Sequence, residues 1–170
     1  MSEDRTPHLI TVTLTEGGAS PCVTKPTKNF REMVARAAAY TWASPNTLLG
    51  ALAALILLSL GGRARVVSGV VEVGGGWGGR AIASLPRMLS FNAMTLGHVV
   101  IGVSESALTA SREHELVHVR QYERWGPFFL PAYALSSLWQ VLRGRRAYWD
   151  NWFEREAFAI DVNRPARRDL

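Results

Sequence analysis

The sequence predicts an α+β fold, in which one small domain combines short strands with several helices and follows one hydrophobic helix. Three observations support this fold class. The 170 residues suffice for a single hydrophobic core but are few for two. Short runs rich in β-branched residues indicate strands, and longer runs with apolar residues at helical spacing indicate helices. The stretch from Ala37 to Gly62 contains no charged residue.

The N-terminal region, residues 1–43, is expected to be polar and to end in an amphipathic helix. Leu9–Thr15 alternates apolar residues with threonine, as in a half-buried strand, although a mobile tail is the alternative. A helix begins near Asn29, and Arg31 and Arg36 make one of its faces basic. This pattern suits a helix on an anionic membrane surface, and an ordinary core helix is the alternative.

Residues 44–62 predict a hydrophobic helix that crosses a membrane. Ser44 and Pro45 suit the N-cap and the first helical position, and the uncharged run Thr47–Leu60 follows. Trp42 and arginines beyond the other end can anchor the helix in the bilayer. A buried central helix is the alternative, because apolar stretches shorter than 18 residues are common in domain cores.

Residues 63–162 are predicted to form the folded domain. Arg65–Val73 and Ala93–Val103 have the composition of strands. The glycine-rich stretch Gly74–Gly79 lacks the lysine of a phosphate-binding loop and predicts a flexible turn.

Two further helices are expected in this domain. The first begins at Thr109 or Ser111 and ends at Trp125, because Gly126 can adopt a left-handed cap and a proline follows. The second covers Phe128–Leu142, is interrupted by Pro131 and precedes an arginine-rich run. It fits either a bilayer surface or the domain core. Residues 163–170 are expected to be a basic tail.

The run His114-Glu115-Leu116-Val117-His118 carries the clearest chemistry of the chain. Positions four apart lie on one face of a helix, so the two imidazoles can bind one zinc ion. Glu115 then lies close enough to act as the general base toward a water molecule without being a ligand.

A catalytic zinc ion usually has three protein ligands, and two glutamates are candidates for the third. Glu154 and Glu156 lie in a predicted helix for which Asp150 or Asn151 is the N-cap. Residues two apart project to opposite sides of a helix, so only one glutamate can face the metal.

The run from His114 to Gln121, followed by Phe153 to Ala159, resembles the gluzincin class of zinc metallopeptidases in its minimal form. It is also similar to small bacterial membrane-associated proteins that carry the first run. The resemblance covers roughly residues 90–160. It implies a small antiparallel sheet, a zinc helix and a helix with the third ligand. The expected location is a bacterial inner membrane.

The resemblance further implies one Zn²⁺ ion held by His114, His118 and Glu154, with Ala157 three residues after the glutamate. Glu156 and Ala159 satisfy the same spacing, so the choice depends on the preceding Phe153. Some gluzincins have an acidic residue four positions after this ligand, which braces a histidine. Phe158 occupies that position here, so the bracing partner is unassigned.

The expected function is that of a membrane-associated zinc metallopeptidase acting on a peptide or protein. Tyr148 and Tyr122 are candidates for stabilising the oxyanion, although Tyr122 suits packing within its own helix. In gluzincin-like folds the strand before the zinc helix forms the edge that binds substrate, so Ala93–Val103 is the candidate, and His98 should point away from the metal. The alternative is a non-catalytic metal-binding or membrane interaction protein.

The charge balance bears on the partners of the protein. The net charge of +5 suggests an anionic partner, and membrane lipid is preferred because no nucleic-acid-binding motif is present. Cys22 is the single cysteine, which excludes an internal disulfide.

Overall fold

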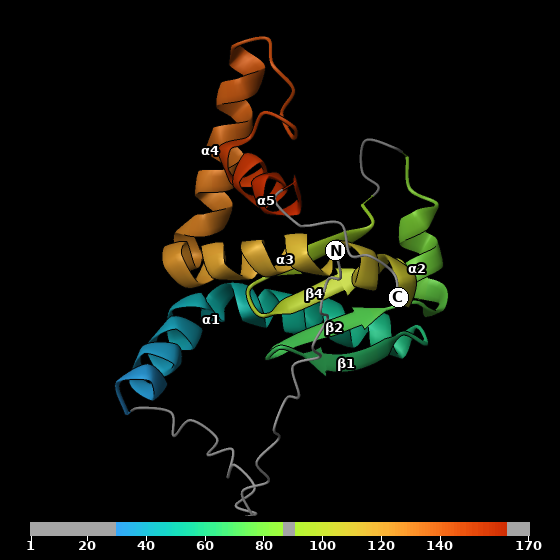
Figure 1. Ribbon diagram of the computed structural model, residues 1–170. Helices are drawn as coiled ribbons and strands as arrows, with labels where there is room; N and C mark the ends of the chain where they lie inside the picture. Colours follow the sequence, from blue (N-terminus) through green and yellow to red (C-terminus); the bar gives the residue numbers. More distant parts are fainter. Residues whose placement is uncertain (1–29, 87–90, 163–170) are drawn as a thin grey trace, which may run out of the picture.

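The computed structural model describes residues 30–86 and 91–162. Its four-stranded sheet lies between helices (Figure 1). The expected strand Leu9–Thr15 and the basic tail lie outside the described residues. The elements in chain order are α1 (Phe30–Ser59), β1 (Arg63–Val67), β2 (Val70–Gly74), α2 (Gly76–Ala83), β3 (Ala93–Leu96), β4 (Val99–Gly102), α3 (Glu105–Trp125), the 3-10 helix η1 (Gly126–Phe128), α4 (Phe129–Leu142) and α5 (Trp152–Val162).

Helices and a small sheet are both present, which confirms the α+β class. The sheet is mixed, so the expectation of an antiparallel sheet is wrong. The strand order is β1-β2-β4-β3. β1 with β2 and β3 with β4 form two antiparallel hairpins. The second hairpin joins the first through its returning strand, and this makes β2 and β4 a parallel pair. β1 and β3 are therefore the edges.

Each of the two predicted strands is in fact a hairpin. Val67 pairs with Val70, so Ser68 and Gly69 form a two-residue turn. Their φ angles of 53° and 83° are the positive values that a tight hairpin turn of this kind requires. Leu96 likewise pairs with Val99 across a turn that begins at Gly97, with φ of 62°.

The glycine-rich stretch forms a helix rather than a flexible turn. α2 begins at Gly76 and continues through Gly78 and Gly79. A side chain at Gly79 would collide with the carbonyl oxygen of Val103, and one at Gly78 would collide with Leu57. The glycines thus allow α2 to pack closely against its neighbours, which stabilises a helix that glycine alone disfavours.

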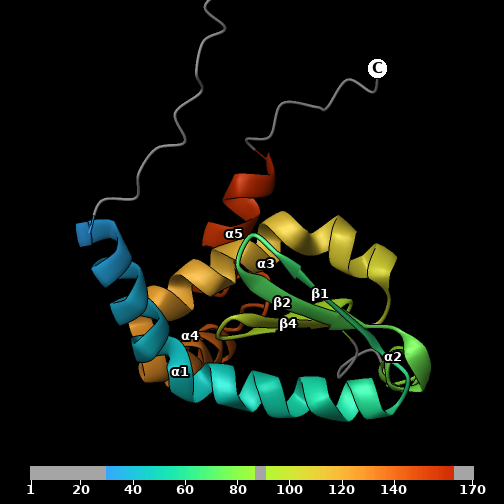
Figure 2. The same ribbon diagram turned by 90° about the horizontal axis from the view of Figure 1, so that it is seen from below.

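α1 is one continuous helix, so the expected helix start at Ser44 is wrong. Pro45 lies inside the helix. The helix bends between its N-terminal part and the part below the sheet (Figure 2), as a proline inside a helix allows. The predicted boundary between residues 43 and 44 therefore falls within one element. α1 is long and apolar enough to cross a membrane by length and composition alone.

The sheet lies between α1 on one face and α3 on the other (Figure 2). Side chains along each strand point alternately to the two faces of the sheet, as the pleat of a strand requires. Val73, Val99 and Ile101 pack with Ala54 and Leu57 of α1. On the other face, a second core consists of Val70, Val100, Leu108 and Val119.

α3 is longer than expected and begins earlier. Its N-cap is Ser104, whose Oγ accepts a hydrogen bond of 3.1 Å from the backbone N–H of Ala107. The helix ends at Trp125, as predicted, and Gly126 has a positive φ of 54°. The 21 residues place the two histidines in the middle of the helix.

α4 and α5 form an arm that stands away from the sheet (Figure 1). Pro131 lies in the first turn of α4, where its missing N–H breaks no helical hydrogen bond, so the helix is not interrupted. Phe129 is the one buried residue of α4. It packs with Ala43, Tyr122 and Phe153 at the base of the arm. Of the two alternatives for this helix, packing in the domain core is therefore not observed over most of its length.

Candidate metal centre

The two histidines of the predicted motif lie side by side on α3. Both side chains are buried. The Nε2 atoms of His114 and His118 are 3.2 Å apart, and the ring planes meet at 79°. One helical turn separates the two residues, so both rings are directed toward the same position.

Glu154 comes to these rings from α5. Its Oε2 lies 3.2 Å from His114 Nε2, and its Oε1 lies 3.5 Å from His118 Nε2. One ligand atom from each residue can be chosen so that all three lie within 4.8 Å of one another. Among the side chains described for residues 30–86 and 91–159, this is the group of histidine, cysteine and acidic residues that could hold a metal ion.

The start of α5 fixes the position of Glu154. Asn151 caps the helix, because its Oδ1 accepts a hydrogen bond of 2.9 Å from the N–H of Phe153. Its Nδ2 donates to the carbonyl of Tyr133 and to the hydroxyl of Ser137, both on α4. Asn151 is fully buried and so connects the two helices of the arm.

Glu156 is not part of the group. Its Oε2 accepts a hydrogen bond of 2.9 Å from Gln121 Nε2, and its Oε1 lies 3.5 Å from Arg124. The structure therefore brings Glu154, and not Glu156, to the two histidines.

The electrostatics of the group suit a bound cation. Burial by itself raises the pKa of Glu154, but His114, His118 and Tyr133 outweigh it and hold the pKa at about 2. Burial lowers the pKa of His118, yet the carboxylate of Glu154 raises it above its ordinary value. In the described structure, Glu154 Oε2 is buried and makes no hydrogen bond of suitable geometry. Two imidazoles and one carboxylate are a donor set that zinc prefers.

Gln121 supplies the brace that the sequence left unassigned. Its Oε1 lies 2.8 Å from Nδ1 of His118, and its Nε2 donates to the carbonyl of Phe153 and to Glu156. A hydrogen bond at Nδ1 leaves Nε2 of His118 for the metal. At the expected position of an acidic brace, the ring of Phe158 packs 4.8 Å from that of His114 instead.

Glu115 lies beside the group without belonging to it. It is buried, and its Oε2 accepts a hydrogen bond of 2.7 Å from Thr95 Oγ1 on β3. Burial raises the pKa of Glu115, and this effect exceeds the lowering by Thr95 and the histidines. A carboxyl group with a raised pKa is suited to accept and return a proton near neutral pH.

Two tyrosines of the arm lie near Glu154. The hydroxyl of Tyr133 donates a hydrogen bond of 2.7 Å to Glu154 Oε1, a contact that the sequence did not predict. Tyr148 is 45% exposed, and burial together with the charge of Glu154 raises its pKa. Tyr122 is 1% exposed, packs on Phe129 and donates to the carbonyl of Thr95, in agreement with a packing role.

The range Ala93–Val103, predicted as one strand for substrate contact, contains the edge strand β3 and the inner strand β4. β4, which directly precedes α3, is paired on both sides, so the edge strand of this hairpin is β3. At Thr95, the carbonyl oxygen of that edge already accepts the hydroxyl of Tyr122 at 3.2 Å. The edge to which a peptide strand could be added is therefore β3, which lies within the predicted range Ala93–Val103.

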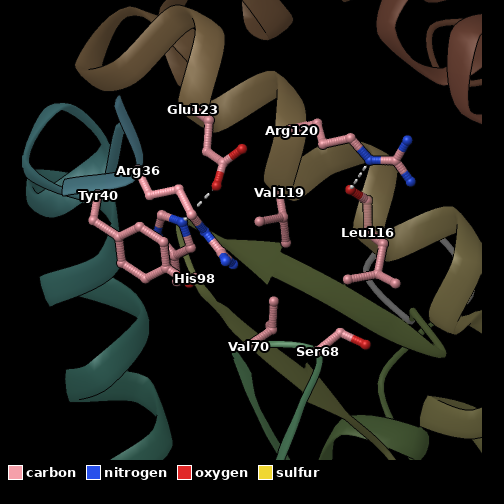
Figure 3. Close-up of a pocket in the computed structure, with 9 residues that line it drawn as sticks. All are labelled: Arg36, Tyr40, Ser68, Val70, His98, Leu116, Val119, Arg120 and Glu123. Atoms are coloured by element: carbon pink, nitrogen blue, oxygen red, sulfur yellow. Dashed lines mark hydrogen bonds and ion pairs between the residues drawn. The ribbon is translucent and has the colours of Figure 1, made fainter. Parts of the chain in front are cut away.

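His98 is not in the metal group, as expected. It lies in a pocket of about 170 Å³ between α1, the hairpin turns and α3 (Figure 3). Its Nε2 is 3.2 Å from Glu123, its Nδ1 is 3.3 Å from Thr47, and its ring stacks on Tyr40. Because protein groups occupy both ring nitrogens, His98 has a structural role at this junction.

The centre thus combines candidate ligands from α3 and α5 with a hydrogen bond from α4, next to a buried carboxyl group.

Comparison of the chain with known protein families, curated proteins and solved structures found no match.

Proposed function

We propose that this protein is a zinc-dependent hydrolase of the gluzincin type that cleaves peptide bonds. One observation carries the proposal. His114, His118 and Glu154 come from two helices and converge within 4.8 Å, and these three residues alone make up the group in the described chain. Three protein ligands are typical of catalytic zinc sites, whereas structural sites have four.

The three residues would hold the metal, and Glu115 would move the proton. Bound zinc acidifies water and polarises a carbonyl group. Glu115 would accept a proton from the attacking water and pass it to the leaving amine. Its burial and its hydrogen bond to Thr95 fix the carboxyl group beside the ligands for this task.

Tyr148 and Tyr133 are the candidates for stabilising the oxyanion. Tyr133 already donates to Glu154 Oε1 at 2.7 Å, which favours a role in orienting that ligand. Tyr148 is partly exposed, and the charge of Glu154 raises its pKa, so this side chain is both accessible to a substrate and close to the ligand group. We therefore assign the oxyanion role to Tyr148.

The decisive experiment compares two variants with the native protein, purified without added zinc. We expect about one zinc ion per chain in the native protein and in Glu115→Gln, and almost none in His118→Ala. Cleavage of an unbiased peptide mixture should fall by about 10²-fold or more in Glu115→Gln, because the proton acceptor is lost.

Other outcomes would contradict the proposal. A protein that retains zinc in all three forms has its metal elsewhere. A native protein that binds zinc but cleaves at the rate of Glu115→Gln would be a non-catalytic metal-binding protein.

A further inference from the structure

The outer face of α1 exposes a strip of leucines to solvent. Leu48, Leu52 and Leu55 are 70%, 59% and 64% exposed. They lie three or four residues apart and so follow one side of the helix. Such a contiguous apolar strip is unfavourable in water and indicates an interaction surface.

A second apolar strip lies on α4. Leu135, Leu138 and Leu142 are each more than half exposed. Between the strips, the exposed rings of Trp42 and Phe128 are 6.1 Å apart and connect α1 with η1. Trp42 and Phe128 thus bring together the elements that carry the two strips, and the apolar surface comprises both strips and these two rings.

The opposite face of α1 is buried in the protein, so lipid cannot surround the helix on all sides. Ala43, Asn46, Gly50, Ala54 and Leu57 are buried on that side. Gly50 lies so close to β3 that an added Cβ would be 2.6 Å from the carbonyl of Leu96. A helix packed this tightly on a sheet cannot cross a bilayer unless the polar sheet enters the hydrocarbon as well.

The charges around the apolar surface suit an anionic membrane. Residues 33–71 and 126–149 contain no aspartate or glutamate. Arg36 and Arg63 lie toward the two ends of α1, and Arg145 and Arg146 follow α4. Arg143 stacks on Trp139, 4.5 Å from the ring centroid. Arginine and tryptophan side chains beside apolar residues are typical of the headgroup region of a bilayer.

We propose that the α1 and α4 strips lie in the surface of an anionic lipid bilayer, so that the protein is attached to one side of a membrane and does not span it. The proposal is independent of the metal centre.

A vesicle experiment tests the lipid as the partner. The full chain, freed of detergent, is mixed with vesicles of phosphatidylcholine alone or with 30% phosphatidylglycerol as the anionic lipid, and bound protein is measured by flotation. We expect binding mainly to the anionic vesicles and a loss of about a hundredfold in Leu52→Glu/Leu55→Glu, because two leucines no longer leave water. The α4 double variant Leu138→Glu/Leu142→Glu should lose binding to the anionic vesicles to a similar extent.

The matched control is Val66→Glu, which changes an apolar residue of 73% exposure on β1 and should bind as the native protein does. Unchanged binding of both leucine variants would overturn the proposal. A native protein that forms a stable dimer and ignores vesicles would overturn it too, because a second copy would then cover the strips.

Labelling distinguishes attachment on one side from crossing. In a Cys22→Ser background, single cysteines replace the exposed Glu32 or Arg63, close to the two ends of α1. A membrane-impermeant maleimide added outside vesicles should label both positions equally. Labelling of only one position before the vesicles are opened would show a transmembrane helix.

Discussion

His118 Nδ1 lies 2.8 Å from Gln121 Oε1, and the remaining contacts of the amide define the direction of this bond. Gln121 Nε2 donates to Phe153 and Glu156, which only accept. The Oε1 atom must therefore accept from His118, so that Nδ1 carries the proton and Nε2 faces Glu154 and His114. The tautomer needed for metal binding is already selected by the fold.

Gln121→Leu should lower zinc affinity by about 10- to 100-fold, because the His118 ring loses the bond that orients it. Competition with a chromogenic chelator measures the effect. Gln140→Leu on α4 is the control and should bind zinc as the native protein does. Equal affinities of the two variants would show that the brace has no influence on the metal.

Glu154→Gln and Glu156→Gln separate the two candidate third ligands. Both changes remove a charge and keep the shape of the side chain. Because Glu154 contacts both histidines, its variant should lose zinc, as metal analysis will show. Glu156→Gln should lose at most about tenfold in affinity, since Glu156 acts through Gln121. The reverse order would assign the ligand to Glu156.

Tyr148→Phe and Tyr133→Phe test the division of roles between the tyrosines. If Tyr148 stabilises the oxyanion, its variant should keep zinc and lose about 10²-fold in kcat with little change in KM. Tyr133→Phe removes the hydrogen bond to Glu154 and should weaken zinc binding instead. Steady-state kinetics and metal analysis of both proteins check this contrast. A Tyr148→Phe protein with native kcat would leave Tyr148 without a catalytic role.

Glu72→Gln tests the ion pairs that attach α3 to the sheet. Burial raises the pKa of Glu72, but Arg112 and Arg65 outweigh it and lower the pKa below 4.5. Glu72 therefore stabilises the fold above pH 4.5, and this contribution is lost as the pH falls through the lowered value. The variant should be less stable by about 1.5–3 kcal/mol near neutral pH and show less loss in acid.

Urea unfolding at several pH values measures both effects. The matched control is Glu105→Gln, because Glu105 forms an exposed ion pair of 3.7 Å with Arg63. Exposed pairs contribute little, so this variant should unfold as the native protein does. A Glu72→Gln protein with native stability and native acid sensitivity would contradict the prediction.

The pair His114 and His118 was predictable because its information is local, whereas the choice of Glu154 came only from the resemblance to gluzincins. A spacing of four places His114 and His118 on one helical face whatever surrounds the helix, and Asp150 or Asn151 predicted the start of α5. Gln121 and Tyr133 were missed as partners because their roles depend on how α3, α4 and α5 pack, which periodicity does not specify.

The errors in the fold have the same origin. The turns at Ser68-Gly69 and Gly97-His98 lie within apolar runs, so each hairpin resembled one strand. The glycines of α2 disfavour a helix locally, but close packing against Val103 and Leu57 outweighs that preference. Pro45 suits a helix start, yet α1 continues through it because both parts of the helix are anchored, by Ala43 in the cluster with Tyr122 and by Ala54 and Leu57 on the sheet.

The origin of the ligands on α3 and α5, on either side of α4, has a mechanical consequence. A cation held by both helices would close a loop of chain that contains the whole of α4, and it would thereby reduce the conformational entropy of every partly opened state. Chelation should therefore make the chain between Arg143 and Asp150 more sensitive to proteases while the sheet stays resistant. The metal would then fasten the arm to the body as well as serve chemistry.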